Sequence, residues 1–380
     1  MDLTRIRPTW VEVDLDAIVH NITALRHLVP GAQFMAVVKA DGYGHGALPT
    51  ARVALQAGAA WLGVATVEEA VQLREAGVTA PILMLGFVSP SQAETVVRYG
   101  LRTTLFHLDL AEALSQVGET LGRKVPVHLK IDTGMSRIGI RPSEAVSFVR
   151  ALQELPAIEV EGIFTHLATA DEPDNDFADQ QLALFKGVLA HLAEIGVNPP
   201  VRHALNSAGI MLHPEGQFDL VRGGAAMYGI EPDPAVQWPV PLEPALTWRT
   251  RVVHVKTVEP GTPISYGCTY RAADVEKIAT LPLGYADGYS RFLSNRGEVL
   301  IRGRRCPVVG RVCMDQTMVR IPDDLDVLVG DEVVLMGEQQ GEWITAGDMA
   351  RTIGTINYEV LCAISKRVPR LYRQHGQLQL

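Results

Sequence analysis

The chain has 380 residues, of which 47% are apolar and 20% are charged. This length is enough for two domains, and the composition is that of a globular protein and not of a disordered one. The formal net charge of −9 argues against nucleic acid and anionic membranes as partners, because both repel an acidic protein.

The N-terminus does not have the pattern of an export signal. Residues Met1 to Arg5 lead into mixed sequence and not into a long apolar stretch. The longest apolar run, Pro81–Leu85, is too short to cross a bilayer. The four cysteines form no CxxC pair, which predicts free buried thiols. We therefore expect a cytoplasmic protein without membrane partners.

Short apolar runs alternate with amphipathic stretches over the first 240 residues. Helices are expected at Leu15–Val29, Thr66–Ala76, Ser143–Leu155 and Phe177–Ile195, and Thr66 with Glu69 forms a capping-box pattern. About eight strand–helix units in succession predict a (β/α)8 barrel, with a doubly wound open sheet as the alternative. The expected strands are Trp10–Asp14, Phe34–Lys39, Trp61–Ala65, Pro81–Leu85, Leu101–Phe106, Val125–Asp132, Glu159–His166, His203–Asn206 and Phe218–Arg222.

A proline-rich segment, Pro232–Pro244, is typical of a domain linker. Beyond it, short runs separated by Gly and Pro predict a mainly β domain, with a helical stretch near the C-terminus. The expected domains are therefore a barrel over residues 1–240 and a β-strand-rich domain over residues 241–380. The strands expected in the second domain are Thr250–Val258, Glu298–Arg302, Gln316–Ile321 and Glu332–Met336.

One strand ends on a lysine and breaks into a glycine-rich turn, from Phe34 through Lys39 to Gly46. In a barrel, the C-terminal ends of the strands converge on the active-site face. A lysine in a partly desolvated pocket has a lowered pKa, which suits a Schiff-base nucleophile. A surface lysine at a strand end is the competing interpretation, and this segment alone favours it.

Polar residues also follow other predicted strands, which is the pattern of a barrel active site. The run from Asn206 to Gly209 and the pair Gly223–Gly224 can offer backbone N–H groups to an anion. With a buried lysine, they suggest a phosphorylated cofactor held by a Schiff base. No metal site is expected, because the histidines are scattered. The other polar strand-end residues are Lys130, Asp132, Arg137, His166 and Arg222.

Nine segments in order resemble the alanine racemase family of fold-type III pyridoxal phosphate (PLP) enzymes. They are VVKADGYGHG, KIDTGMSRIG, THLATAD, NSAG, VRGGAAMYG, SYGCTY, LGYADGY, GRVCMDQ and INYEV, and they extend from Lys39 to Tyr358. The resemblance implies a barrel, a β-strand-rich domain and a homodimer that shares its active sites. It also implies a two-base interconversion of L- and D-alanine, which provides D-alanine for peptidoglycan.

The resemblance assigns the reacting groups. Lys39 would carry PLP and act as one base, and Tyr266 of the partner subunit would act as the other. Inverting a tetrahedral carbon requires a base on each side of it. His166 matches the histidine that contacts this tyrosine. Arg222 would face the pyridine nitrogen of PLP and, because it stays protonated, would leave that nitrogen unprotonated.

The resemblance also assigns binding residues. Arg137 matches the residue that contacts the substrate carboxylate and the phenolic oxygen of PLP, and Lys130 matches a lysine that is often carbamylated. The partner's Met314, followed by Asp315, would bind the carboxylate. The phosphate-binding residues would be Tyr43, Ser207, Gly224, Ala225 and Tyr358, and Tyr285 and Tyr358 would narrow the entrance.

Three other functions compete with this one. A broad-spectrum amino-acid racemase of the same fold is the main alternative, although we expect such enzymes to be exported. A PLP-dependent decarboxylase would have an acidic residue where Arg222 stands. A PLP-binding homeostasis protein would be a barrel alone, without the domain that carries Tyr266.

Overall fold

The computed structural model describes residues 7–231 and 236–379. The chain forms two compact units. One contains Ile18–Gly42 and Ala47–Glu243, and the other combines the N-terminal residues up to Ala17, Tyr43–Gly46 and the chain from Pro244 onward. Within the described residues, no helix is both long enough and apolar enough to cross a membrane.

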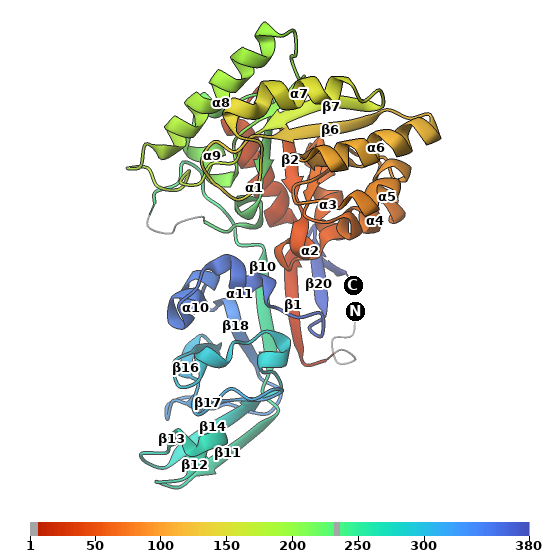
Figure 1. Cartoon of the computed structure of the whole chain (residues 1–380). Helices are drawn as coiled ribbons and strands as arrows, with labels where there is room; N and C mark the ends of the chain where they lie inside the picture. The colour runs from red at the N-terminus through yellow and green to blue at the C-terminus, as the bar shows by residue number, and fades with distance from the viewer. Residues whose placement is uncertain (1–6, 232–235, 380) are drawn as a thin grey trace. The chain divides into compact units, whose positions relative to one another are not determined.

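The first unit is built on eight parallel strands in the order β8-β7-β6-β5-β4-β3-β2-β9. Figure 1 labels β2, β6 and β7 of this sheet. Two backbone hydrogen bonds join β9 to the chain at β8, because Asp219 N–H donates to Arg202 O and Arg222 N–H donates to Leu205 O, both at 3.0 Å. The sheet therefore closes into the predicted barrel, and the open-sheet alternative is wrong. The strands are β2 (Gln33–Val37), β3 (Trp61–Val64), β4 (Ile82–Met84), β5 (Arg102–Leu105), β6 (Val125–Lys130), β7 (Ile158–Phe164), β8 (Val201–His203) and β9 (Leu220–Gly223).

Helices alternate with the barrel strands, and the four that were predicted lie close to their predicted positions. The predicted capping box is present at the start of α4, where Thr66 Oγ1 accepts Glu69 N–H at 3.3 Å and the Glu69 side chain accepts Thr66 N–H. The helices are α1 (Leu15–Leu28), α3 (Ala47–Gln56), α4 (Val67–Glu75), α5 (Ala93–Arg98), α6 (Leu108–Leu121), α7 (Ala145–Gln153), α8 (Phe177–Glu194) and α9 (Ser207–Leu212).

The second unit is rich in strands, as predicted. Its largest sheet has the order β16-β15-β18-β10-β1-β20-β21 with β19 beside β18, and β11, β14 and β17 form a second sheet. The strands are β1 (Thr9–Asp14), β10 (Leu246–Arg251), β11 (His254–Val258), β12 (Pro263–Ile264), β13 (Tyr270–Arg271), β14 (Glu276–Leu281), β15 (Glu298–Ile301), β16 (Arg304–Pro307), β17 (Thr317–Ile321), β18 (Glu332–Gln339), β19 (Glu342–Ile344), β20 (Arg370–Gln374) and β21 (Gln377–Gln379). Helices α10 (Ala346–Ile353) and α11 (Asn357–Cys362) complete it.

Two strand predictions need correction. The strand expected at Trp10–Asp14 exists as β1, but it pairs with β10 and β20 in the second unit and not with a barrel strand. The run Thr250–Val258, expected as one strand, is divided between two sheets. The chain changes sheet at Val252 and Val253, whose N–H groups donate to Asp331 O and Thr280 O.

Two other expectations are settled only in part. Residues 232–235 of the expected linker lie outside the described residues, and the boundary between the units falls between Glu243 and Pro244. The four cysteines are free thiols as predicted, but Cys268 and Cys362 are exposed and not buried.

Candidate active site

A left-handed turn presents Lys39 at the C-terminal end of β2. Ala40, Asp41 and Gly42 all have positive φ angles, of 53°, 52° and 62°. For residues with a Cβ this conformation is costly, so the turn must be held in place. Ala40 N–H donates to Glu69 Oε1 at 2.6 Å, and Ala47 N–H donates to Asp41 Oδ1 at 2.9 Å. The side chain that caps α4 therefore also fixes the turn after Lys39.

A buried guanidinium lies in the barrel strand next to β2. Arg222, in β9, is only 3% exposed and is registered beside Met35 of β2. Its Nη1 is 2.9 Å from His203 Nδ1 and its Nη2 is 3.2 Å from His166 Nδ1. Nη2 also donates to the carbonyls of Thr165 and Ala204. Burial lowers the pKa of Arg222 to about 9, which still leaves it charged at neutral pH.

These contacts fix the tautomer of His166. A guanidinium can only donate hydrogen bonds, so Nδ1 of His166 is an acceptor and the proton of the neutral ring lies on Nε2. Burial, followed by the charges of Arg222, Lys130 and Arg137, holds the pKa of His166 well below its ordinary value. The ring is therefore neutral at physiological pH and can donate one hydrogen bond from Nε2.

A chain of hydrogen bonds leads from Arg222 through the barrel. His203 accepts from Arg222 at Nδ1, so its Nε2–H donates to His128 Nδ1 at 2.9 Å. His128 Nε2 lies 3.3 Å from Glu161 Oε2, and Arg102 donates to the same carboxylate at 3.1 Å. Burial would raise the pKa of Glu161, but the hydrogen bonds from His128 and Arg102 outweigh it and lower that pKa. Both ring nitrogens of His203 and of His128 therefore have a hydrogen-bond partner.

The sequence did not predict that the hydrogen bonds from Arg222 through His203 and His128 to Glu161 belong to the site. His128 and His203 are both completely buried. The signal was present in β6, because His128 and Lys130 stand two residues apart and so point to the same face of the strand.

Lys130 ends β6 in a buried position, at 4% exposure. Its Nζ donates to Ile131 O at 3.0 Å and lies 5.4 Å from the centre of the Phe164 ring. Burial, together with the charges of Arg222 and Arg137, lowers the pKa of Lys130 to about 7. Among the described residues, Lys130 forms no ion pair with Asp132, although the two residues are close in sequence.

The loop after β6 places Arg137 at the surface of the barrel unit. Oδ1 of Asp132 accepts the N–H groups of Gly134 and Ser136 at 3.0 Å, which shapes the loop. Ser136 has a φ of 55°, a left-handed conformation that Gly or Asn adopts more readily.

Backbone N–H groups gather around Ser207 at the start of α9. Ser207 Oγ accepts Gly224 N–H at 2.9 Å and Ala226 N–H at 3.2 Å. A Cβ on Gly223 would lie 2.1 Å from the Phe34 ring, so the close approach of the chain here requires glycine. Such a cluster of N–H groups and a hydroxyl fits a phosphate.

The remaining predicted residues lie in the second unit. Tyr266, Tyr285 and Met314 are 72%, 43% and 53% exposed. Their three segments are joined: Ser265 Oγ donates to Arg311 O at 2.6 Å, and Tyr285 N–H donates to Cys313 O at 3.0 Å.

The same unit holds two of the residues predicted to bind phosphate. The rings of Tyr43 and Tyr358 lie 6.3 Å apart between centroids. Burial raises the pKa of Tyr43 further above neutral pH, and its hydroxyl is a hydrogen-bond donor there.

The predicted site residues thus fall into two groups. The barrel unit brings together Arg222 and His166, and separately Ser207 and Gly224, and it also contains Lys39, Lys130, Arg137 and Ala225. The second unit contains Tyr43, Tyr266, Tyr285, Met314, Asp315 and Tyr358.

Comparison with known proteins decides the family. The model for the alanine racemase N-terminal domain matches residues 13–232, and the model for the C-terminal domain matches residues 245–372. The chain belongs to the alanine racemase family. This membership confirms the resemblance found in the sequence, and the chain is accordingly an isomerase of a PLP-dependent family.

Similar proteins extend over the whole chain. Alanine racemase from Symbiobacterium thermophilum is 60% identical, over 98% of this chain and 99% of its own. The crystal structure of alanine racemase from Bacillus anthracis with bound L-Ala-P has a TM-score of 0.94 at 42% identity and covers 98% of this chain and 97% of its own. Histidine racemase from Leuconostoc mesenteroides has a TM-score of 0.90 at 28% identity, over 97% and 99% of the two chains. The activity that this family supports is alanine racemisation.

Proposed function

We propose that the protein interconverts L- and D-alanine with PLP in a two-base reaction, and that it supplies D-alanine for peptidoglycan in the cytoplasm. The observation that carries the proposal is the buried Arg222 guanidinium. It is anchored to His203 and His166 in the strand beside the one that presents Lys39.

The barrel residues fit PLP. Lys39 would hold the cofactor, and Ser207, Gly224 and Ala225 would bind its phosphate, with Tyr43 and Tyr358 completing the phosphate site. When bound, PLP draws electrons from the α-carbon of the substrate, and the proton on that carbon becomes easier to remove. Arg222 would donate a hydrogen bond to the ring nitrogen. Because Arg222 keeps its proton, that nitrogen stays unprotonated, which weakens electron withdrawal and favours simple reprotonation.

The two bases are proposed to be Lys39 and Tyr266. A base on each side of the α-carbon removes the proton from one face and returns one to the other. The high exposure of Tyr266 in a single chain, 72%, agrees with a role in the active site of a partner subunit in a homodimer. His166 would donate from Nε2 to the phenolate oxygen, which stabilises the form of Tyr266 that accepts a proton.

Substrate recognition is proposed to depend on the carboxylate and on the size of the side chain. The fork of Arg137 suits a carboxylate, and Met314 offers a backbone N–H beside Asp315. Tyr285 and Tyr358 would narrow the entrance and favour a methyl group. The histidine racemase shows that this fold also serves a larger side chain, so a broad-spectrum racemase remains the second candidate.

A racemisation assay over several amino acids tests the function. We expect kcat/KM for alanine to exceed that for serine by about tenfold or more, and that for histidine by a wider margin, because a narrow pocket discriminates against added atoms. Comparable values for alanine, serine and histidine would favour the broad-spectrum racemase. Absence of alanine racemisation would contradict both candidates.

Lys130 is proposed to be carbamylated. Carbamate formation requires a neutral amine, and with its pKa lowered to about 7 Lys130 is largely neutral above that pH. A protonated amine at Lys130 would be repelled by Arg222 and Arg137, and a pair of cations 4 Å apart costs about 4 kcal/mol at an effective dielectric constant near 20, which favours the neutral amine. The modification would place an anion there, which these guanidinium groups attract, and would give Arg137 an acceptor.

We expect Lys130→Ala to lower kcat/KM by about 100-fold through loss of an orienting charge, and added acetate to restore part of it. Lys124→Ala is the matched control, because Lys124 lies at the opposite end of the same strand, exposed, with its Nζ on Pro156 O. The direct measurement is ¹³C NMR after equilibration with ¹³C-bicarbonate at pH 8. A carbamate signal should appear in wild type and Lys124→Ala and be absent in Lys130→Ala. A wild-type spectrum without it rules the carbamate out.

A further inference from the structure

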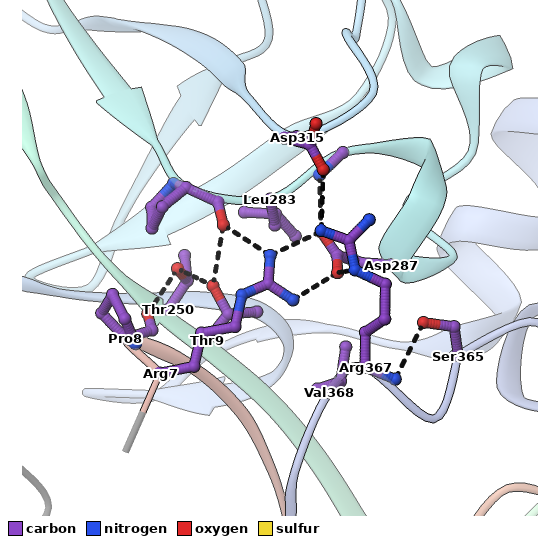
Figure 2. Close-up of polar contacts among 12 residues, drawn as sticks. Arg7, Pro8, Thr9, Thr250, Leu283, Asp287, Asp315, Ser365, Arg367 and Val368 are labelled. Atoms are coloured by element: carbon purple, nitrogen blue, oxygen red, sulfur yellow. Dashed lines mark hydrogen bonds and ion pairs between the residues drawn. The ribbon is translucent and has the colours of Figure 1, made fainter. Parts of the chain in front are cut away.

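A buried carboxylate anchors one of the exposed loops of the second unit. Asp287 ends the turn Tyr285–Asp287, and its side chain is completely buried. Its carboxylate accepts hydrogen bonds from Arg7 Nη1 and Nη2, and Oδ2 also accepts Gly284 N–H at 3.1 Å (Figure 2). Burial would raise the pKa of Asp287, but the hydrogen bonds from Arg7 and Gly284 and the charge of Arg367 outweigh it and lower that pKa. The carboxylate is therefore ionised at neutral pH.

A second arginine, Arg367, connects the carboxylate of Asp287 to that of Asp315. Arg367 Nε lies 3.6 Å from Asp287 Oδ1, and Arg367 Nη2 donates to Asp315 Oδ1 at 2.7 Å. Figure 2 shows this guanidinium between the two carboxylates, with Arg7 on the other side of Asp287. The arginine is half exposed, and Asp287 would keep Arg7 if Arg367 were removed. The bridge therefore adds to an anchor that is complete without it.

The two carboxylates belong to loops that touch through their backbones. Tyr285 N–H donates to Cys313 O at 3.0 Å and Ala286 N–H donates to Met314 O at 3.1 Å. A Cβ on Gly284 would lie 2.0 Å from Cys313 O, so only glycine permits this approach. We call residues 284–287 and 313–315 the two-loop block.

The two-loop block holds a backbone donor without an internal acceptor. In the part of the chain that the structure describes, the N–H of Met314 donates to no protein group, whereas that of the preceding Cys313 donates to Gln316 O at 2.9 Å. A carboxylate anion is a suitable acceptor for such an N–H. However, the next residue is Asp315, whose negative charge would repel that anion unless a cation neutralises it.

We propose that Arg367 and Asp315 are positioning residues for the substrate carboxylate. Arg367 ties the Met314–Asp315 segment to the buried Asp287, and so fixes the Met314 N–H beside the loop that carries Tyr285. It also neutralises Asp315, which would otherwise repel the carboxylate. Asp315 thus acts through Met314 and does not touch the substrate itself. This inference rests on the proposed function, because it takes the ligand of Met314 to be the alanine carboxylate.

Removal of the bridge should weaken binding and leave the chemical step unchanged. We expect Arg367→Met to raise KM for alanine about five- to tenfold and to change kcat by less than about twofold. This pattern is expected when a variant loses an interaction that is equally strong in the ground state and the transition state. The inhibition constant of propionate, which has the carboxylate but no amino group, should rise by the same factor. Arg367→Lys keeps the charge and should recover most of both constants. Adding Asp315→Asn to Arg367→Met should also recover part of the loss, because it removes the uncompensated charge.

The control and a readout independent of activity complete the experiment. Arg304→Met removes a similar half-exposed arginine from the same unit, one that pairs with Asp324 at 2.8 Å, and should change nothing. In the enzyme without substrate, hydrogen–deuterium exchange at the amides of Tyr285 and Ala286 should become faster in Arg367→Met and not in Arg304→Met.

Two outcomes would overturn the inference. In the first, both KM for alanine and the inhibition constant of propionate in Arg367→Met stay within twofold of the wild-type values, whether or not hydrogen–deuterium exchange becomes faster. The other is a fall in kcat with KM unchanged. Failure of the proposed function itself would be recognised differently, because wild type and Arg304→Met would then not racemise alanine.

Discussion

Lys39→Ala is expected to lower racemisation by about 10⁴-fold or more, because this change removes both the anchor of the cofactor and one of the two bases. Borohydride reduction of the wild-type enzyme should fix PLP on Lys39, and peptide mapping should find the adduct there. The left-handed turn at Ala40–Gly42 explains why the effect should be local. Ala40 N–H and Ala47 N–H hold it through the side chains of Glu69 and Asp41, and both of these bonds remain in the variant.

Lys186→Ala is the control for this prediction, since Lys186 is exposed on α8 of the same unit. It should keep wild-type activity and the PLP adduct. An adduct mapped to any lysine other than Lys39 would contradict the assignment, as would substantial racemisation by Lys39→Ala.

Tyr266→Phe is the second large effect, with an expected loss of about 10²- to 10⁴-fold in kcat, the usual contribution of one general base. The loss should be asymmetric when proton exchange is measured. In D₂O, exchange of the α-proton should persist for one enantiomer, through Lys39, and fail for the other. Equal loss of exchange from both enantiomers would contradict a two-base reaction.

Tyr270→Phe tests whether the effect of Tyr266→Phe is merely structural. Tyr270 lies in the strand after Tyr266, and its hydroxyl donates to the Glu276 carboxylate at 2.7 Å. We expect Tyr270→Phe to lower the stability of the protein and to keep exchange of the α-proton from both enantiomers. If Tyr266→Phe acted only by destabilising this region, it should give the same result.

The barrel was predictable because its signals are local and repeated. Apolar runs with little alternation, separated by amphipathic stretches, indicate β2 to β9 without knowledge of any contact. The error at β1 has the same origin. The run Trp10–Asp14 has the composition of a barrel strand, and only its pairing with β10, more than 200 residues away, places it in another sheet. Pairing over such a distance leaves no mark in a local pattern.

The site was predictable where a strand ended on a polar residue, and less so inside the barrel. Lys130, His166 and Arg222 stand at strand ends, whereas the role of His128 and His203 follows only from the hydrogen bonds that link them to Arg222 and Glu161. Asp315 shows a further limit. The family motif predicts that it lies beside the substrate, but its pairing with Arg367 joins residues 52 positions apart and has no local signal.

The central claim, that Lys39 and Tyr266 of two subunits form one site, is tested most directly with hybrid dimers. Lys39→Ala and Tyr266→Phe are each expected to keep about 1% of wild-type activity or less. The two variants are mixed under conditions in which differently tagged subunits demonstrably exchange. Random exchange makes half of the dimers hybrid, and one of the two sites in each hybrid has both bases, so activity should return to about a quarter of wild type. Hybrid dimers that are purified by both tags and remain inactive would contradict a site shared between subunits.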